Sequence, residues 1–139
     1  MLAIAACSRR DPIASCGDDL RGVYRSGDER WMVLDSGATL EAYPLFPDGG
    51  APAPGAPAAL EVAPRVIDLA RGLDGVTGTL HRRYGRRADQ CDAQLPVHVT
   101  RCTGDAIELA VTDPSPPTAF APCTWPPPGP SRVVQWRRE

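Results

Sequence analysis

The sequence predicts an all-β domain, a small antiparallel up-and-down meander barrel of about eight strands with two long Pro-rich loops. Two observations predict this fold. Short runs rich in β-branched and aromatic residues, several alternating between apolar and polar side chains, recur between turns of Gly, Asp and Ser. No stretch shows a helical period. A barrel also removes the exposed edges that eight strands in an open sheet would leave.

Eight runs account for the expected strands. They span residues 20–25, 31–35, 39–46, 66–70, 76–84, 97–101, 107–111 and 133–136. Most connections between them are short turns. We expect three longer loops: a polar, Arg-rich one at 85–94 and two proline-rich ones at 47–64 and 113–131.

Composition limits the classes of partner. The 139 residues carry 15 Lys and Arg against 17 Asp and Glu, a net charge of −2. A chain so balanced has no general attraction for nucleic acid, and we expect no nucleic-acid partner. No apolar run approaches the ~18 residues of a membrane-spanning helix.

The N-terminus carries a motif of its own. The run Ile4-Ala5-Ala6-Cys7 resembles the lipobox of bacterial lipoproteins. The resemblance implies cleavage before Cys7, a diacylglycerol anchor on that cysteine, and a place in the cell envelope. Ser8 after the anchor implies sorting to the outer membrane if the source is Gram-negative. The expected organisation is therefore residues 1–6 as the remnant of a signal peptide, 7–19 as a tether and 20–139 as one barrel domain.

The segment departs from the lipoprotein pattern in one respect. It has no basic stretch before the apolar run, and that run is short. We expect that the true start lies upstream or that the chain is trimmed.

The other four cysteines form an even set, which favours two disulfides in an oxidising compartment. In a meander, Cys16 and Cys102 fall at one end of the barrel, and Cys91 and Cys123 at the other. Because bridged Cα atoms must lie within ~7 Å, we expect Cys16–Cys102 and Cys91–Cys123. A fold-back of the intervening loop would give Cys91–Cys102 instead.

A second resemblance concerns both ends of the predicted barrel. The sequence Gly22-Val23-Tyr24 in the first strand and Trp136-Arg137-Arg138 in the last resemble the lipocalins, with Tyr in place of the usual Trp. Lipocalins are eight-stranded meander barrels in which a C-terminal Arg packs over the aromatic ring of the first strand. The resemblance implies a small apolar ligand in the lumen.

The side chains that commonly bind metals do not form a set. His81 and His98 fall on the outer faces of neighbouring strands, a placement that allows the two imidazoles to lie near each other but offers no third ligand. No metal and no cofactor are therefore expected. Asp68 interrupts an apolar run, and we expect it on the outer face rather than buried with a raised pKa.

Two features are candidates for a partner or ligand surface. Arg82, Arg83, Arg86 and Arg87 either meet anionic headgroups or form a solvated hairpin tip. Trp125, in the second proline-rich loop, either plugs one barrel end, which we expect, or anchors a partner. The other aromatic side chains (Tyr24, Trp31, Tyr43 and Trp136) serve the core or line a ligand pocket.

No nucleophile, general base or phosphate-binding loop is recognisable, so we do not expect an enzyme. Two functions remain. One is a lipid-anchored envelope lipoprotein that acts as an interaction or structural module, bound to the membrane through Cys7 and to an envelope protein through its loops. The alternative is a barrel that binds a small apolar ligand. A lumen filled with side chains favours the first, and a void of several hundred Å³ the second.

Overall fold

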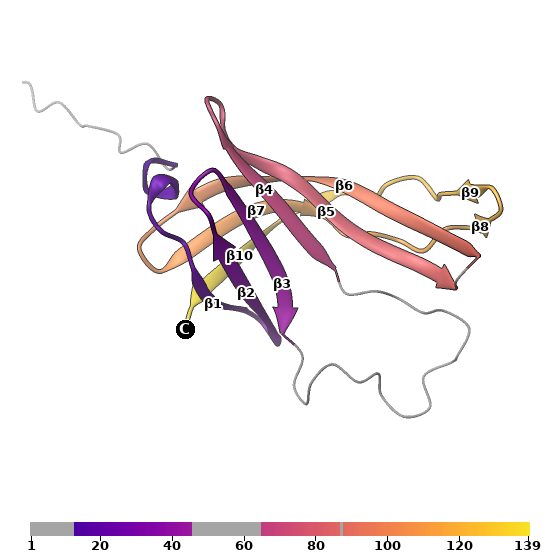
Figure 1. Cartoon of the computed structure of the whole chain (residues 1–139), viewed down its shortest axis with the longest axis horizontal. Coiled ribbons are helices and arrows are strands. Elements are labelled where there is room, and N and C mark those ends of the chain that lie inside the picture. Colours follow the sequence, from indigo (N-terminus) through magenta and orange to yellow (C-terminus); the bar gives the residue numbers. More distant parts are fainter. Residues whose placement is uncertain (1–12, 46–64, 87) are drawn as a thin grey trace, which may run out of the picture.

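Eight antiparallel strands close into a barrel in the computed structural model (Figure 1). The structure describes residues 13–45, 65–86 and 88–139. Around the barrel the order is β1-β10-β7-β6-β5-β4-β3-β2, so neighbours in space are neighbours in the meander and the predicted up-and-down fold is confirmed. The barrel strands are β1 (Gly22–Ser26), β2 (Glu29–Asp35), β3 (Thr39–Leu45), β4 (Val66–Gly72), β5 (Gly75–Arg86), β6 (Asp89–Cys102), β7 (Ala106–Thr112) and β10 (Ser131–Arg138).

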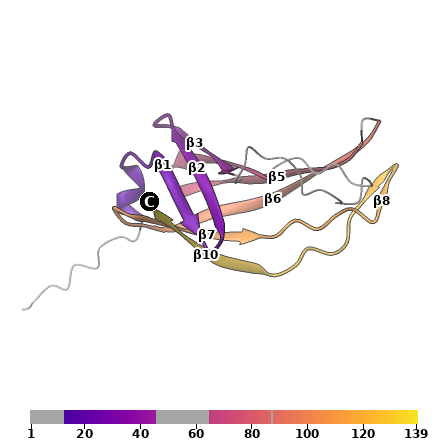
Figure 2. The ribbon, with the colours of Figure 1, turned by 90° about the horizontal axis from the view of Figure 1, so that it is seen from below.

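The hairpin of β5 and β6 is longer than predicted and extends beyond the barrel. The prediction of a loop at 85–94 is wrong, because strand pairing continues to Arg86 opposite Asp89. The polar composition of this stretch comes from outward side chains, whereas Tyr84, Cys91 and Ala93 between them are buried. We call residues 82–95, the part of the hairpin beyond the barrel, the arm (Figures 1 and 2).

The second proline-rich region runs beside the arm. Within the segment 113–130, which we call the proline segment, β8 (Ala119–Phe120) pairs with β9 (Cys123–Thr124) in a small hairpin. The disulfide Cys91–Cys123 ties this hairpin to the arm, with Cα atoms 5.8 Å apart. The first predicted proline-rich loop, at 47–64, lies outside the described residues.

Inward side chains fill the barrel. The rings of Trp31 and Trp136 stack with centroids 4.9 Å apart, and Tyr24 lies 6.5 Å from Trp136. Around these rings pack aliphatic side chains from the barrel strands, among them Val33, Leu40, Ile67, Leu69, Val76, Leu80, Val97, Val99, Ile107, Leu109 and Val111. Of the four predicted core or pocket aromatics, Tyr43 alone is outside this core.

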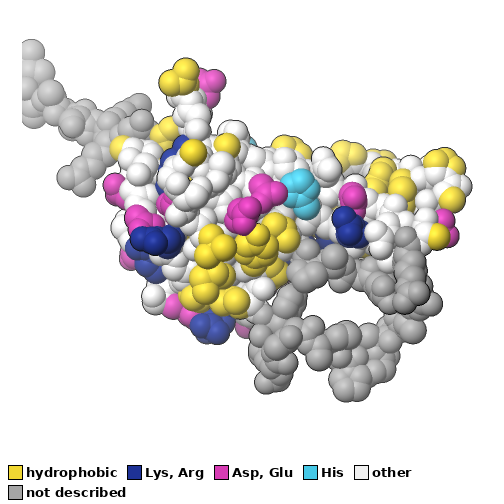
Figure 3. All heavy atoms as spheres, viewed as in Figure 1, with side chains coloured by type: hydrophobic (Ala, Val, Ile, Leu, Met, Phe, Trp, Pro, Cys, Tyr) yellow, Lys and Arg dark blue, Asp and Glu magenta, His cyan; other side chains and the backbone are white. Residues whose placement is uncertain are grey.

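Polar side chains face outward on the barrel wall, where Figure 3 shows them mixed with hydrophobic ones. The hydroxyl of Tyr43 donates to Glu41. Asp68 is exposed, and its Oδ2 lies 3.1 Å from Nε2 of His81, so the prediction of an outward Asp68 is confirmed.

Glycine allows two close approaches in β5. A Cβ at Gly78 would lie 1.7 Å from the carbonyl oxygen of Asp68, so only glycine lets β4 and β5 pack there. Gly85 has a φ of +99°, and a Cβ there would lie 2.1 Å from the carbonyl oxygen of Asp89. Both glycines shape the hairpin that carries the arm.

One end of the barrel, the closed end, is covered by the N-terminal part of the described chain. A 3-10 turn, η1 (Ala14–Gly17), lies there, although this stretch was expected to belong to a tether. The disulfide Cys16–Cys102 holds it with Cα atoms 5.1 Å apart, and Leu20 enters the core. No helix among the described residues is long and apolar enough to cross a membrane.

Arg71 ties the closed end together. Its guanidinium donates to the carbonyl oxygens of Cys16 at 2.8 Å and Gly37 at 2.6 Å, and it forms a 2.7 Å ion pair with Asp35. The Arg71 guanidinium is the main reason why the pKa of Asp35 lies well below its usual range. The hydrogen bond that the Leu20 N–H donates to Asp35 lowers this pKa further. The carboxylate is therefore charged in the folded barrel.

Arg138 covers the same end from the C-terminal strand. It lies 5.4 Å above the ring of Tyr24 and donates to the Tyr24 hydroxyl at 2.8 Å, while that hydroxyl donates to the carbonyl oxygen of Leu20. Burial raises the pKa of Tyr24 despite the nearby cation. This is the packing of a C-terminal Arg over a first-strand aromatic ring that the lipocalin resemblance implies.

Candidate functional site: a groove beside the arm

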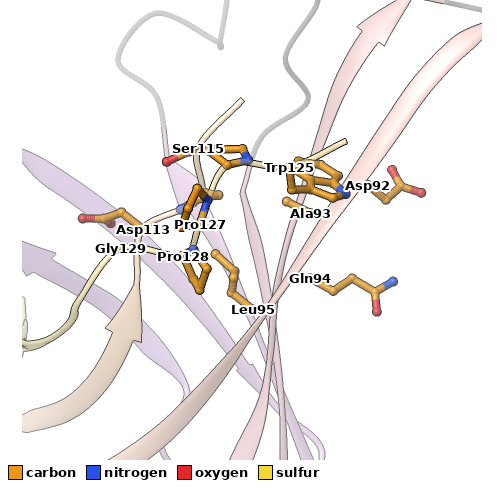
Figure 4. Close-up of a pocket in the computed structure, with 12 residues that line it drawn as sticks. Asp92, Ala93, Gln94, Leu95, Asp113, Ser115, Trp125, Pro127, Pro128 and Gly129 are labelled. Atoms are coloured by element: carbon orange, nitrogen blue, oxygen red, sulfur yellow. The ribbon is translucent and has the colours of Figure 1, made fainter. Parts of the chain in front are cut away.

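A cavity of about 450 Å³ lies outside the barrel, between the arm and the proline segment (Figure 4). One wall is the strand β6, and the other is formed by the beginning and the end of the proline segment. The residues that line it are Asp92, Ala93, Gln94, Leu95, Asp113, Pro114, Ser115, Trp125, Pro126, Pro127, Pro128 and Gly129. We call this cavity the groove.

The β6 wall of the groove is an unpaired strand edge. On one side β6 pairs with β5 from Asp89 to His98, but on the other side its pairing with β7 ends where His98 lies opposite Ala110. Pro96 has no N–H to continue that ladder, and Pro114 follows the end of β7. Within the described part of the chain, residues 92–95 therefore pair with β5 alone.

The opposite wall cannot complete the sheet. Three successive prolines, Pro126 to Pro128, have no N–H groups to donate to β6. No backbone hydrogen bond joins the β6 edge to the proline segment among the described residues. The proline segment thus borders the strand edge without covering its hydrogen-bonding groups.

Trp125 lies at one end of the groove and is 40% exposed. Its ring meets Tyr84 edge-on, with centroids 6.3 Å apart, and Figure 4 shows it beside Ala93. In the same view Leu95 and Pro128 point toward each other, whereas Gln94 points away from them. The prediction that Trp125 plugs a barrel end is wrong, because the ring packs on the arm outside the barrel core.

The charges at the rim of the groove are paired. The carboxylate of Asp92 lies 2.9 Å from Nε of Arg83, and that of Asp113 lies 2.6 Å from Nε of Arg132. The hydrogen bond from Arg132 is the main reason why the pKa of Asp113 is lowered. The groove therefore presents an electrically neutral rim around an apolar centre.

The predicted arginine surface is divided between two faces. Arg82 lies 5.5 Å above the ring of Tyr84, on the inward side of β5, whereas Arg83 pairs with Asp92 on the outward side. Arg86 ends β5, and Arg87 lies outside the described residues. The structure brings Trp125 and Arg82 together around Tyr84, but it does not place Arg82 and Arg83 in one patch.

A second cavity opens at the barrel end opposite η1. Its volume is about 290 Å³, and Trp31, Trp136 and Leu80 form its floor. Arg65 lies 5.5 Å above the Trp31 ring and forms an ion pair with Glu29. Because Trp31 is only 2% exposed, the cavity is a shallow mouth above a filled interior rather than an open lumen.

The two histidines are not close neighbours. His81 lies opposite Gln94 and His98 opposite Thr77, so the two positions are separated by four residues along the hairpin. This spacing corresponds to roughly 13 Å, so the structure does not bring the two imidazoles near each other. No group of three potential metal ligands is present in the described ranges. Cys7, the predicted lipid anchor, is outside them.

The cysteine pairs are those that the strand order predicts, Cys16–Cys102 and Cys91–Cys123. The fold-back pair Cys91–Cys102 is not formed, because the two residues lie near opposite ends of the single strand β6.

The fold and its cavities define a class: an up-and-down barrel with a side-chain core, one sealed end, and a groove along a protruding hairpin. Comparison of the chain with protein-family models, curated proteins and solved structures gives no match.

Proposed function

We propose that this protein is a non-catalytic interaction module of the cell envelope, anchored by a lipid on Cys7, with the groove beside the arm as its partner-binding surface. The groove carries the proposal, because it combines a half-exposed Trp with an unpaired strand edge outside a filled barrel. Exposed aromatic anchors in pockets are a common source of binding energy at protein interfaces.

The two disulfides indicate an oxidising, extracytoplasmic compartment. The lipobox-like run that ends at Cys7 supports export and anchoring in the same compartment. Metabolic labelling with an alkyne-bearing fatty acid tests the anchor. We expect label on the wild-type protein and none on Cys7→Ser. Equal labelling of the two proteins would rule out Cys7 as the anchor.

The partner surface is tested by site-specific photo-crosslinking in the producing cell. A photoreactive residue at Ser115 lies in the groove, and the same residue at Asp74, in the turn between β4 and β5, is the matched exposed control. We expect a discrete adduct from position 115 alone, weakened by Trp125→Ala. No adduct at 115, or the same adduct from both positions, would contradict the proposal.

The barrel mouth supports a second candidate function, the binding of a small apolar ligand. The specific observation is the cavity of about 290 Å³ above the stacked Trp31 and Trp136 rings. Native mass spectrometry of protein extracted in mild detergent distinguishes the two functions. A small-molecule mass that survives desalting and is lost in Trp31→Ala would favour the ligand, whereas protein without added mass favours the interaction module.

A further inference from the structure

We propose that the groove binds an extended, uncharged peptide segment of a partner protein, which adds as a strand to the free edge of β6. This inference rests on the proposed function, since it names the chemistry of the partner at the same surface. In strand addition, main-chain hydrogen bonds supply affinity, and pockets for alternate side chains supply specificity.

The free edge supplies the main-chain partners. In an antiparallel ladder every second residue directs its N–H and C=O to the same neighbour. Pro96 is tolerated inside β6 if its nitrogen faces away from β5, since proline within a sheet is found where no ladder donor is needed. Gln94 lies two residues away and therefore directs its own N–H and C=O into the groove.

The proline wall selects a single strand as the occupant. Its prolines cannot donate to β6, so the groove does not close on itself. The proline segment borders the cavity of about 450 Å³ opposite β6 and would obstruct the further strands of an incoming sheet. We therefore expect a lone extended peptide, and not the edge of another barrel, as the occupant. The β6 wall spans residues 92–95, which corresponds to roughly 13 Å of paired peptide.

The charges of the groove set the composition of the peptide. Asp92 and Asp113 are each neutralised by an arginine, so the rim complements neither an acidic nor a basic segment. Ala93, Leu95 and Trp125 provide apolar contacts between the walls. A peptide with small or apolar residues at alternate positions matches this pattern, because alternate side chains of a strand point to the same side.

The test uses the full-length oxidised protein and a phage-displayed library of linear dodecapeptides. A selected peptide is synthesised with a fluorophore, and its binding is measured by polarisation. We expect Gln94→Pro, which removes one edge N–H, to weaken binding by roughly tenfold, and the control Gln94→Ala to leave it within about twofold. Circular dichroism and thiol titration establish that each variant retains its fold and both disulfides.

Two peptides N-methylated at alternate residues provide a measurement that does not depend on the variants. We expect methylation of one set of amides to abolish binding and methylation of the other set to preserve it, because only one set faces β6. Binding that tolerates both methylated peptides and Gln94→Pro would overturn strand addition.

The inference and the proposed function fail differently. If no peptide is selected but the residue at position 115 crosslinks a partner, the partner binds as a folded surface. In that case the inference is wrong and the proposed function stands. If neither a peptide nor an adduct is found, both are wrong.

Discussion

The closed end of the barrel and the arm are each held by one disulfide, but they differ in how far their polar groups are hydrogen-bonded. At the closed end, Arg71 and Arg138 donate to backbone carbonyls and to Asp35 and Tyr24, and the Cys16–Cys102 bridge lies in the core. On the arm, the Cys91–Cys123 bridge lies outside the core cluster, and residues 92–95 of β6 have no backbone partner on one side among the described residues.

This difference indicates that the polar residues of the closed end act in stability and that the residues of the arm act in binding. At the closed end, Arg71, Arg138, Asp35 and Tyr24 are hydrogen-bonded to one another or to backbone carbonyls, so these side chains stabilise the barrel. The arm retains unpaired main-chain groups and a half-exposed Trp, features that a two-stranded hairpin carries at a cost in local stability. The predictions below test whether stability is concentrated at one end and binding at the other.

The largest expected effect comes from removing the disulfides. Cys16 and Cys102 are separated by 86 residues and Cys91 and Cys123 by 32. From chain entropy alone, loss of the first bridge costs about 4.5 kcal/mol and loss of the second about 3.7 kcal/mol. We expect the measured gap to be wider, because only the first bridge packs in the core.

Urea unfolding of the two double Cys→Ala variants measures this gap. Loss of Cys16–Cys102 should destabilise the whole barrel, whereas loss of Cys91–Cys123 should increase amide exchange mainly in the arm. If the second variant were the less stable, the arm would belong to the cooperative core and the comparison of the two ends would be wrong.

The next effect concerns one ion pair at each end. The Asp35 side chain is 4% exposed and its partner Arg71 17%, whereas Asp113 and Arg132 are about half exposed. Breaking a buried pair leaves an uncompensated charge, so we expect Asp35→Asn to cost about 3 kcal/mol. The matched change Asp113→Asn should cost less than about 1 kcal/mol. Urea titration of both variants at pH 7 tests the contrast.

The contribution of Asp35 also depends on pH. Its pKa is lower in the folded state than in the unfolded chain, mainly through Arg71. The stabilisation from this shift is fully present above the pKa that Asp35 has in the unfolded chain, which is ~4. It is lost as the pH falls toward the pKa of Asp35 in the folded state. We expect the difference between wild type and Asp35→Asn to shrink steadily below about pH 4. A difference that stays constant down to pH 2 would mean that the carboxylate charge is not responsible.

The sequence predicts much of the barrel, including its strand order and its disulfides. Strand order follows from the alternation of apolar runs and turns, and it also places the cysteines in two pairs at opposite ends. The outward position of Asp68 follows from the same alternation. These features are predictable because they depend on local period and on meander topology, which short-range patterns determine.

The groove is not predictable in the same way. Residues 85–94 were expected to form a loop because their polar side chains mask the alternation that buries Tyr84, Cys91 and Ala93. Pro96, inside a strand, is the one signal that could have indicated an unpaired edge. Leu95 faces Pro128 across the groove because the proline segment returns beside the arm. No local sequence pattern specifies this return.

A smaller effect is expected from one hydroxyl at each end. The Tyr24 hydroxyl donates to Leu20 and accepts from Arg138, whereas no hydrogen bond within the described residues involves the Tyr84 hydroxyl. Tyr24→Phe should cost about 1–2 kcal/mol, because it removes the hydrogen bond to the carbonyl oxygen of buried Leu20 and the one from Arg138. Tyr84→Phe should stay within about 0.5 kcal/mol of wild type. Thermal unfolding compares the two, and equal losses would show that the hydrogen bonds of Tyr24 contribute nothing.

Trp125→Ala is expected to have the smallest effect on stability. It is also the sharpest test of the contrast between the arm and the closed end. Its edge-on contact with Tyr84 contributes about 0.5–1.5 kcal/mol, and its ring lies outside the barrel core. We therefore expect Trp125→Ala to lower the free energy of unfolding by about 1 kcal/mol and to weaken crosslinking from position 115. The matched Trp136→Ala should cost about 3–5 kcal/mol, because that ring is buried in the barrel.

Either tryptophan variant alone is ambiguous, since an unfolded protein binds nothing. Together they separate the two roles, because the proposal requires binding to be weakened in Trp125→Ala while the barrel remains folded. If Trp125→Ala were as destabilising as Trp136→Ala, the arm would be a structural extension of the core. The exposed Trp125 ring and the unpaired edge of β6 would then not support a binding function.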